Sequence, residues 1–267
     1  MTRRIAVGLG VAAIGFASMY FAWTFYVLVL AIGFVALFEL NALCEIKGQP
    51  LEYPVAVFGV GAYVALAMFG RLSTWEGALL AVVIIASFWI GMYGEEKGYF
   101  ARTAYTLLAV LYIGKLLTYF IFIRAVPTNG VWWTILVVLL IAFTDIFAMV
   151  VGSLLGRHQL TKISPNKTIE GSVGAIIIVT AFGAVAAWMP QLHLLPWQGA
   201  VLGLVTCVAA QGGDLAESAL KRDAGVKDTG TVIQGHGGVL DRFDSYLFGG
   251  MAFFGTLHLI GALGFPT

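Results

Sequence analysis

Charged residues are scarce in this chain of 267 residues. Asp, Glu, Lys and Arg make up 11% of it and hydrophobic residues make up 60%, whereas about 25% of the residues of a soluble domain are charged. So few charges cannot cover a water-exposed surface. A net charge of +1 also argues against a nucleic-acid partner, because such proteins need a basic face to displace counterions from phosphates. The composition therefore indicates an integral membrane protein.

Cysteine is nearly absent as well. Cys44 and Cys207 lie far apart, and neither belongs to a Cys-x-x-Cys or Cys/His pattern. A disulfide framework or a structural zinc site needs several such residues at characteristic spacings. The sequence therefore indicates neither a disulfide framework nor a structural zinc site, and the two cysteines are expected to be packing residues.

Long apolar runs fill most of the chain. A membrane-spanning helix needs about 20 apolar residues. The run from Ile5 to Phe38 is far longer than the apolar part of a signal peptide, so we interpret it as two spans. The predicted spans are residues 5–22, 24–43, 53–70, 76–94, 103–123, 131–152, 171–189, 197–214 and 245–264. We predict an all-α, polytopic membrane protein with about nine transmembrane helices, about five of them in residues 1–130 and the catalytic region in 131–267.

Lys and Arg are distributed unevenly between the two sides that these spans define. Positively charged loops are retained in the cytoplasm. With the N-terminus inside, the outer side holds Arg71 and Arg124, Lys115 lies within a span, and the inner side holds the other twelve basic residues. These are Arg3, Arg4, Lys47, Lys97, Arg102, Arg157, Lys162, Lys167, Lys221, Arg222, Lys227 and Arg242. We therefore predict a cytoplasmic N-terminus and an outer C-terminus.

Two glycine-rich polar segments, residues 145–171 and 214–244, lie on the predicted cytoplasmic side. The second holds six acids (Asp214, Glu217, Asp223, Asp228, Asp241 and Asp244) and four bases (Lys221, Arg222, Lys227 and Arg242). Carboxylates of this kind hold Mg²⁺, and Lys and Arg neutralise phosphate oxygens. If the eighth span continues as a helix, Asp214, Glu217, Ser218 and Lys221 share one face. A merely solvated loop is the alternative, but it is disfavoured in so apolar a chain.

The second segment resembles the signature of the phosphatidate cytidylyltransferases, also called CDP-diacylglycerol synthases. The matching positions are Ser218, Leu220, Lys221, Arg222, Lys227, Asp228, Gly230, Ile233, His236, Gly237, Gly238, Asp241, Arg242 and Asp244. Gln234 departs from the pattern, since the family usually has proline there. In the first segment, Asp145, Ala148, Gly152, Gly156, Arg157, residues 162–165, Lys167, Thr168, Glu170 and Gly171 resemble an upstream motif of the same family. The resemblance covers the C-terminal half, whereas the N-terminal half matches only in hydropathy.

This resemblance implies that phosphatidic acid and CTP react to give CDP-diacylglycerol and pyrophosphate. The lipid phosphate would attack the α-phosphorus of CTP in line. A phosphate monoester with a second pKa of about 6 is mostly dianionic at neutral pH, so no general base is required. The resemblance also implies a homodimer, and the expected location is a bacterial inner membrane with the active site on the cytoplasmic side.

Functional roles can be assigned to individual residues on this basis. Mg²⁺, as one ion or a pair, is expected to bind Asp214, Asp228 and Asp241, with Asp244 and Asp145 as further ligands. The phosphate groups are expected to bind Lys167, Lys221, Arg222, Lys227 and Arg242, with hydrogen bonds from Ser164 and Ser218. His236, Gly237 and Gly238 offer backbone N–H groups to an anion. Asp214, Asp228, Asp241, Lys227 and Arg242 are the candidate catalytic residues.

Several local alternatives stay open at the level of the sequence. Ser164 and Pro165 also fit the start of a helix with Glu170 as a capping acid. Asp145 and Asp214 at membrane depth need a metal ion or a cation as partner, because an unpaired charge there costs about 2.5 to 3.5 kcal/mol. Lys115 could contact a lipid phosphate, pair with Glu39, or extend to the interface.

Other functions are less well supported. A transporter would place charges along a pathway at the membrane midplane, whereas these charges gather at one face and the chain has no internal repeat. A CDP-alcohol phosphatidyltransferase would carry an Asp-Gly-x2-Ala-Arg-x8-Gly-x3-Asp-x3-Asp motif, which is absent. A CTP-dependent polyprenol or phytol kinase stays an alternative, and a purely structural scaffold is the least favoured.

Overall fold

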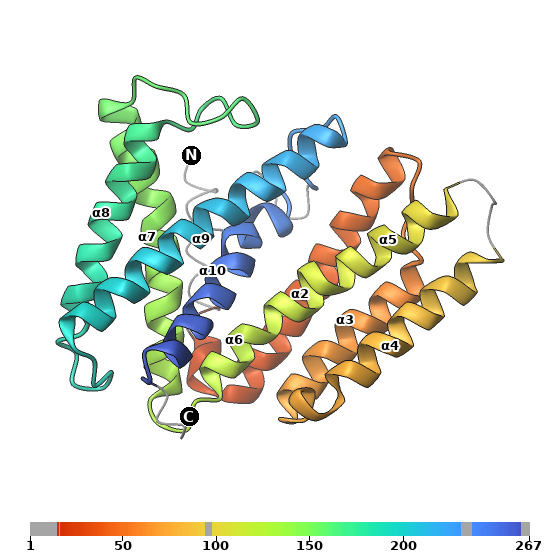
Figure 1. The fold of residues 1–267 in the computed structure, drawn as a ribbon, viewed down its shortest axis with the longest axis horizontal. Coiled ribbons are helices and arrows are strands. Elements are labelled where there is room, and N and C mark those ends of the chain that lie inside the picture. The colour runs from red at the N-terminus through yellow and green to blue at the C-terminus, as the bar shows by residue number, and fades with distance from the viewer. Residues whose placement is uncertain (1–14, 16, 94–97, 231–236, 263–267) are drawn as a thin grey trace. The chain divides into compact units, whose positions relative to one another are not determined.

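The computed structural model describes residues 15, 17–93, 98–230 and 237–262. These residues form helices joined by turns, and an isolated β-bridge joins Gln159 and Thr168. Figure 1 shows the arrangement. The helices are α2 (Ala22–Ile46), α3 (Tyr53–Met68), α4 (Leu72–Gly91), α5 (Tyr99–Ala109), η1 (Val110–Lys115), α6 (Leu116–Arg124), α7 (Gly130–Leu155), α8 (Ile169–Ala186), α9 (Pro196–Asp223) and α10 (Leu240–Leu259). The all-α prediction is confirmed.

Six helices among the described residues are long and apolar enough to cross a membrane. They are Ala22–Ile46, Leu72–Gly91, Tyr99–Arg124, Gly130–Leu155, Ile169–Ala186 and Pro196–Asp223. The third comprises α5, the π-helical turn η1 and α6 in one continuous helix. α3 is apolar but has only 16 residues, and most of the first predicted span, 5–22, lies outside the described residues. The polytopic character is thus confirmed, while the number nine stays a prediction.

Local chemistry explains where several helices begin. Pro54 lies in the first turn of α3 and Pro196 is the first residue of α9. Proline suits this position because the first backbone N–H groups of a helix have no intrahelical acceptor. Thr168 precedes α8, and its side chain accepts a hydrogen bond from the Gly171 N–H at 3.1 Å. Such a cap satisfies one of the free N–H groups of the first turn.

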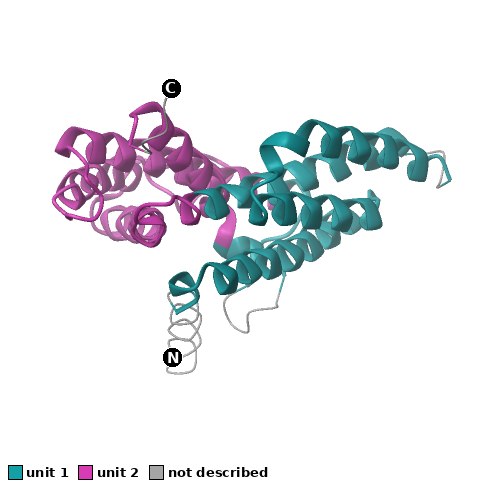
Figure 2. Ribbon diagram, turned by 90° about the horizontal axis from the view of Figure 1, so that it is seen from below, with its two compact units in different colours: residues 1–122, 223–242 teal, residues 123–222, 243–267 magenta. Residues whose placement is uncertain are grey.

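The chain divides into two compact units, coloured separately in Figure 2. Unit 1 comprises residues 1–122 and 223–242, and unit 2 comprises residues 123–222 and 243–267. The first polar segment and the start of the second therefore belong to unit 2. Residues 223–242 of the second segment belong to unit 1. The sequence-based division at residue 130 stays a prediction.

Small residues let the helices of each unit pack closely. In unit 1, a Cβ atom on Gly59 of α3 would lie 2.7 Å from Val110 of η1. In unit 2, a Cβ on Gly183 of α8 would clash with the carbonyl oxygen of Gly199 in α9, and one on Gly199 would clash with that of Gly183. Membrane helices associate through such small residues because lipid gives them no hydrophobic drive to pack. The contact between α8 and α9 fixes two of the helices that flank the polar segments.

Candidate functional site

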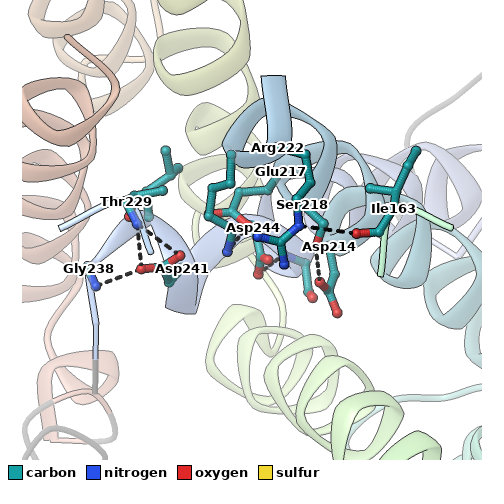
Figure 3. A network of polar contacts seen from close by, with 12 residues as sticks. Ile163, Asp214, Glu217, Ser218, Arg222, Thr229, Gly238, Asp241 and Asp244 are labelled. Carbon is teal, nitrogen blue, oxygen red and sulfur yellow. Dashed lines mark hydrogen bonds and ion pairs between the residues drawn. The ribbon is translucent and has the colours of Figure 1, made fainter. Parts of the chain in front are cut away.

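The polar end of α9 continues the helix to Asp223, well past the predicted end of its span at residue 214. The Ser218 hydroxyl donates to Asp214 Oδ1 at 3.4 Å, as Figure 3 shows. One turn further on, Lys221 Nζ pairs with Glu217 Oε2 at 2.5 Å, and the Glu217 side chain is completely buried. Residues three and four apart are neighbours on a helix surface. The predicted polar face of α9 is therefore present.

Three carboxylates from three helices of unit 2 form what we call the acidic cluster: Asp145 of α7, Asp214 of α9 and Asp244 of α10. The Ser245 hydroxyl donates to Asp145 Oδ1 at 3.4 Å. A Cβ on Gly213 would lie 2.6 Å from the Asp244 carbonyl oxygen, so α9 and α10 touch directly at this level. Sequence positions a hundred residues apart are thereby brought to one place.

Asp244 is the most perturbed acid of the cluster. It precedes the predicted span 245–264 and is 7% exposed. Burial raises its pKa from 3.8 to about 7, the negative charges of Asp214 and Asp145 act in the same direction, and the Ser245 N–H opposes them. Like charges disfavour joint ionisation, and a nearby cation would favour it. The acidic cluster is thus suited to a cationic ligand.

The first polar segment is attached to α9 by two basic side chains. Lys167 forms an ion pair with Asp214. Arg222 Nε donates to the carbonyl oxygen of Ile163 at 3.4 Å (Figure 3). Ser164 follows Ile163, and its carbonyl oxygen accepts from the Lys167 N–H at 3.1 Å in a tight turn. The predicted phosphate-binding residues Ser164, Lys167 and Arg222 therefore lie in one part of unit 2.

The alternative in which Ser164 and Pro165 start a helix is wrong. α8 begins at Ile169, because Thr168 supplies the cap and residues 164–167 form a turn instead. Glu170 does not cap this helix with its own side chain. Its carboxylate binds His158 Nδ1 at 2.6 Å and accepts from the Arg157 N–H at 3.1 Å, which closes the base of the segment between α7 and α8.

In unit 1, the Asp241 carboxylate organises the backbone around it. Its Oδ2 atom accepts from the Gly238 N–H at 2.7 Å and from the Thr229 N–H at 3.0 Å (Figure 3). Gly237 has a φ of +83°, a conformation that side chains rarely adopt. Gly237, Gly238 and Asp241 therefore form one turn at the start of α10. The backbone amide of Gly238 points at a carboxylate of the same turn.

The other predicted residues of unit 1 lie at its surface. Lys227, Asp228 and Arg242 are exposed. His236 and Gln234 lie outside the described residues. The structure thus brings together Gly237, Gly238 and Asp241 in unit 1, and the acidic cluster with Lys167 in unit 2. The roles of all the candidates in catalysis stay predictions.

Glu39 is a residue that the sequence analysis did not assign to the site. It is 1% exposed in α2 of unit 1, and its carboxylate accepts from the N–H groups of Val239 and Leu240 at 2.8 and 2.7 Å. The sequence did contain a signal that could have identified it. Glu39 is a lone acid within an apolar span, and such a residue is by default a functional candidate. Lys115, its suggested partner, pairs instead with Glu76.

The acidic cluster contains carboxylate oxygens that suit magnesium, but these oxygens are not already arranged around a metal site. Carboxylate oxygens are the ligands that Mg²⁺ prefers, and the acidic cluster supplies them from three helices. Among the described residues, no three Asp, Glu, His or Cys side chains are already arranged to hold a metal. Lys167 is the cation that contacts Asp214. A metal at Asp214 would have to compete with this lysine.

Comparison with known proteins gives the family. The sequence profile of the cytidylyltransferase family matches residues 1–260. The chain belongs to this family. It is 34% identical over 256 residues to a phosphatidate cytidylyltransferase of Bacillus subtilis (strain 168), which covers 93% of this chain and 94% of that protein. It is 33% identical over 223 residues to a protein of the same name from Staphylococcus haemolyticus, covering 80% and 85%.

The family also has similar members in plants. Phosphatidate cytidylyltransferase 4, chloroplastic, of Arabidopsis thaliana is 31% identical over 283 residues, covering 94% of this chain and 71% of that protein. Membership thus extends over the N-terminal half, for which the sequence alone indicated only hydropathy. The resemblance based on the two polar segments is confirmed.

Proposed function

We propose that this cytidylyltransferase family member transfers CMP from CTP to phosphatidic acid, giving CDP-diacylglycerol and pyrophosphate. The observation that carries the proposal is 34% identity to the Bacillus subtilis phosphatidate cytidylyltransferase over 93% of the chain. The clustering of acids and bases at the polar end of α9 supports it. An enzyme that joins two polyanions needs both kinds of side chain in one place.

The reaction is a nucleotidyl transfer in which the lipid supplies the nucleophile. A phosphate oxygen of phosphatidic acid forms a bond to the α-phosphorus of CTP, and the bond from that phosphorus to the bridging oxygen breaks. Pyrophosphate leaves with the electron pair of that bond. The attacking phosphate is mostly dianionic at neutral pH, so the protein does not have to remove a proton.

The basic residues of unit 2 are suited to binding and orienting the phosphates. Lys167 contacts Asp214, and Lys221 contacts the buried Glu217, so both ammonium groups are held by carboxylates. Arg222, anchored at Ile163, is exposed at the end of α9. Charge-assisted hydrogen bonds from such groups to phosphate are stronger than neutral ones. Positioning of this kind supplies much of the rate in phosphoryl transfer.

Within unit 2, magnesium would be held by Asp145, Asp214 and Asp244, whereas the sequence analysis expected Asp214, Asp228 and Asp241 as the main ligands. Bound there, a divalent cation neutralises phosphate charge and stabilises the leaving group. The raised pKa of Asp244 supports a cation at this place, because a positive charge favours joint ionisation of neighbouring carboxylates. A cation at Asp214 would compete with Lys167, whose ammonium group would then be available to a substrate phosphate.

The proposal includes a multi-pass protein of a bacterial inner membrane with its N-terminus and polar segments in the cytoplasm, and a homodimer. The bias of Lys and Arg supports the orientation, and CTP is available only on that side. Labelling of a Lys227→Cys variant in intact and opened cells tests the orientation, since native Cys44 and Cys207 are buried. Labelling from the outer side would overturn the orientation.

Labelled CTP tests the reaction. Purified protein is incubated with phosphatidic acid, Mg²⁺ and CTP labelled at either the α- or the γ-phosphorus. Label from the α position is expected in the lipid fraction, and label from the γ position in pyrophosphate. Transfer of the γ label to a lipid alcohol would indicate a lipid kinase instead, and no transfer of either label to lipid would overturn the proposal.

A further inference from the structure

A single buried carboxylate of the N-terminal half contacts the signature segment. Glu39 is 1% exposed and lies in α2, a helix long and apolar enough to cross a membrane. Burying a carboxylate in such a helix is costly unless its oxygens receive hydrogen bonds. The hydrogen-bond donors around Glu39 therefore indicate its role.

The hydrogen bonds that Glu39 receives from the described part of the chain come from the segment between Asp228 and Asp241. Oε1 accepts from the Val239 N–H at 2.8 Å, and Oε2 accepts from the Leu240 N–H at 2.7 Å and from the Thr229 hydroxyl at 3.3 Å. Leu240 is the first residue of α10. The N–H groups at this position have no acceptor within the helix, and the helix end carries partial positive charge. Glu39 thus caps α10 from a separate helix.

Two glycines leave the space that the carboxylate fills. A Cβ atom on Gly230 would lie 2.9 Å from Glu39 Oε1, and one on Gly238 would lie 2.6 Å from Oε2. Real Cβ atoms do not approach oxygen so closely, so both positions need glycine for the carboxylate to reach the backbone. Both glycines belong to the signature of the family. The close approach of Glu39, and at Gly238 also of the Thr229 hydroxyl, accounts for glycine at both positions.

Thr229 links this carboxylate to the candidate catalytic acid. Its hydroxyl donates to Glu39, and its backbone N–H donates to Asp241. Asp241 in turn holds the Gly238 N–H, next to the Val239 N–H that Glu39 holds. The two carboxylates therefore hold the same two short stretches of the chain, Glu39 through the Thr229 hydroxyl and Asp241 through the Thr229 N–H.

We propose that Glu39 is a positioning residue that holds residues 229–230 and 238–241 in the arrangement that nucleotidyl transfer requires. The inference rests on the proposed function for its kinetic part. Glu39 touches backbone and a threonine hydroxyl, so it acts on the reaction through Asp241 and the turn at Gly237 and Gly238. Groups that orient metal or substrate ligands in this way are commonly worth about 10- to 100-fold in activity or metal affinity.

The test is Glu39→Gln, with Glu76→Gln as the matched control. Gln keeps the size of the side chain, but its NH₂ group replaces an acceptor and faces a backbone donor. Glu76 is also a glutamate of a membrane helix in unit 1, and its partner is Lys115. Glu39→Gln is expected to lower kcat about 10- to 100-fold and to raise the Mg²⁺ concentration needed for half-maximal rate. Glu76→Gln is expected to change both by less than about threefold.

Hydrogen exchange supplies a second readout that needs no activity. The Val239 and Leu240 amides are expected to exchange faster in Glu39→Gln and at the wild-type rate in Glu76→Gln. Unchanged exchange in Glu39→Gln would overturn the contact, and faster exchange with wild-type kcat and Mg²⁺ dependence would overturn the positioning role. If the wild-type protein transfers no nucleotide, the proposed function fails while the exchange comparison still decides the contact.

Two milder variants keep the test decisive if Glu39→Gln does not fold. Glu39→Asp retains the charge and is expected to recover part of the activity that Gln loses. Thr229→Val removes only the 3.3 Å hydrogen bond from the Thr229 hydroxyl to Glu39. It is expected to lower kcat less than Glu39→Gln does, and to raise the Mg²⁺ requirement in the same direction. A folded Glu39→Asp and a folded Thr229→Val with wild-type kinetics would together overturn the proposal.

Discussion

Asn in place of Asp244 is expected to make the metal-free protein more stable while it abolishes turnover. Asp244 is 7% exposed, and burial next to Asp214 and Asp145 raises its pKa from 3.8 to about 7. One pKa unit corresponds to about 1.36 kcal/mol. The charged form at pH 7 therefore destabilises the folded state by roughly 4 kcal/mol relative to a neutral side chain. Asn keeps an oxygen for the Ser245 N–H, which donates to Oδ1 at 2.6 Å.

The sign of the pH dependence follows from the direction of this shift. Below pH 3.8 the carboxyl of Asp244 is neutral in both the folded and unfolded states, so it costs nothing. Between 3.8 and about 7 the unfolded state loses its proton while the folded state keeps it, so stability falls as the pH rises. The advantage of Asn is then roughly 2 kcal/mol at pH 5 and roughly 4 kcal/mol at pH 7.

Thermal unfolding in detergent with a chelator, followed by tryptophan fluorescence, measures this advantage. Asp244→Asn is expected to unfold at least about 4 °C above the wild-type protein at pH 7. The difference is expected to shrink by about half or more at pH 5. Added Mg²⁺ is expected to raise the wild-type Tm and to leave that of the variant unchanged. A variant that unfolds below the wild-type protein at pH 7 in chelator would refute the reasoning.

Three other substitutions test separate parts of the structure. Gly183→Ala forces a Cβ against the facing carbonyl of α9, and it is expected to cost about 1 to 3 kcal/mol in unfolding free energy, measured by thermal unfolding in detergent. Thr168→Ala removes the side-chain cap of α8 and is expected to cost about 1 kcal/mol by the same assay. Lys167→Gln removes the cation beside Asp214; the KM for CTP is expected to rise about 10- to 100-fold, because a charged hydrogen bond to phosphate is worth about 1.5 to 3 kcal/mol.

Apolar run length was sufficient to predict the helices but not their ends. The run that ends near residue 214 continues as helix to Asp223, because good helix formers and an i, i+4 pair of Glu217 and Lys221 follow it. Ser164 and Pro165 also fitted the start of α8, which begins instead at Ile169. Proline fits the first turn of a helix, but it fits a turn equally well. Thr168 competes for the cap, and only the fold decides between them.

The partners of buried charges were the hardest feature to predict. The sequence left three possible contacts open for Lys115. In the structure this residue pairs with Glu76, which is 39 residues away. Glu39 and Leu240 are 201 residues apart. No periodicity links such positions, because the contact depends on which helices pack together. Local patterns identified which residues carry charge at membrane depth, and tertiary packing determines which ones meet.

The contacts of Glu39 bear on why family membership extends over nearly the whole chain. The N-terminal helices carry few charged residues and, read alone, would only anchor the protein in lipid. Yet α2 supplies the acceptor that α10 lacks at its first turn, and Gly230 and Gly238 are shaped to admit it. A lipid anchor would tolerate any apolar residue at position 39. A residue that sets the position of the signature segment would not, so a substitution at position 39 in the apolar half of the chain is expected to affect the reaction.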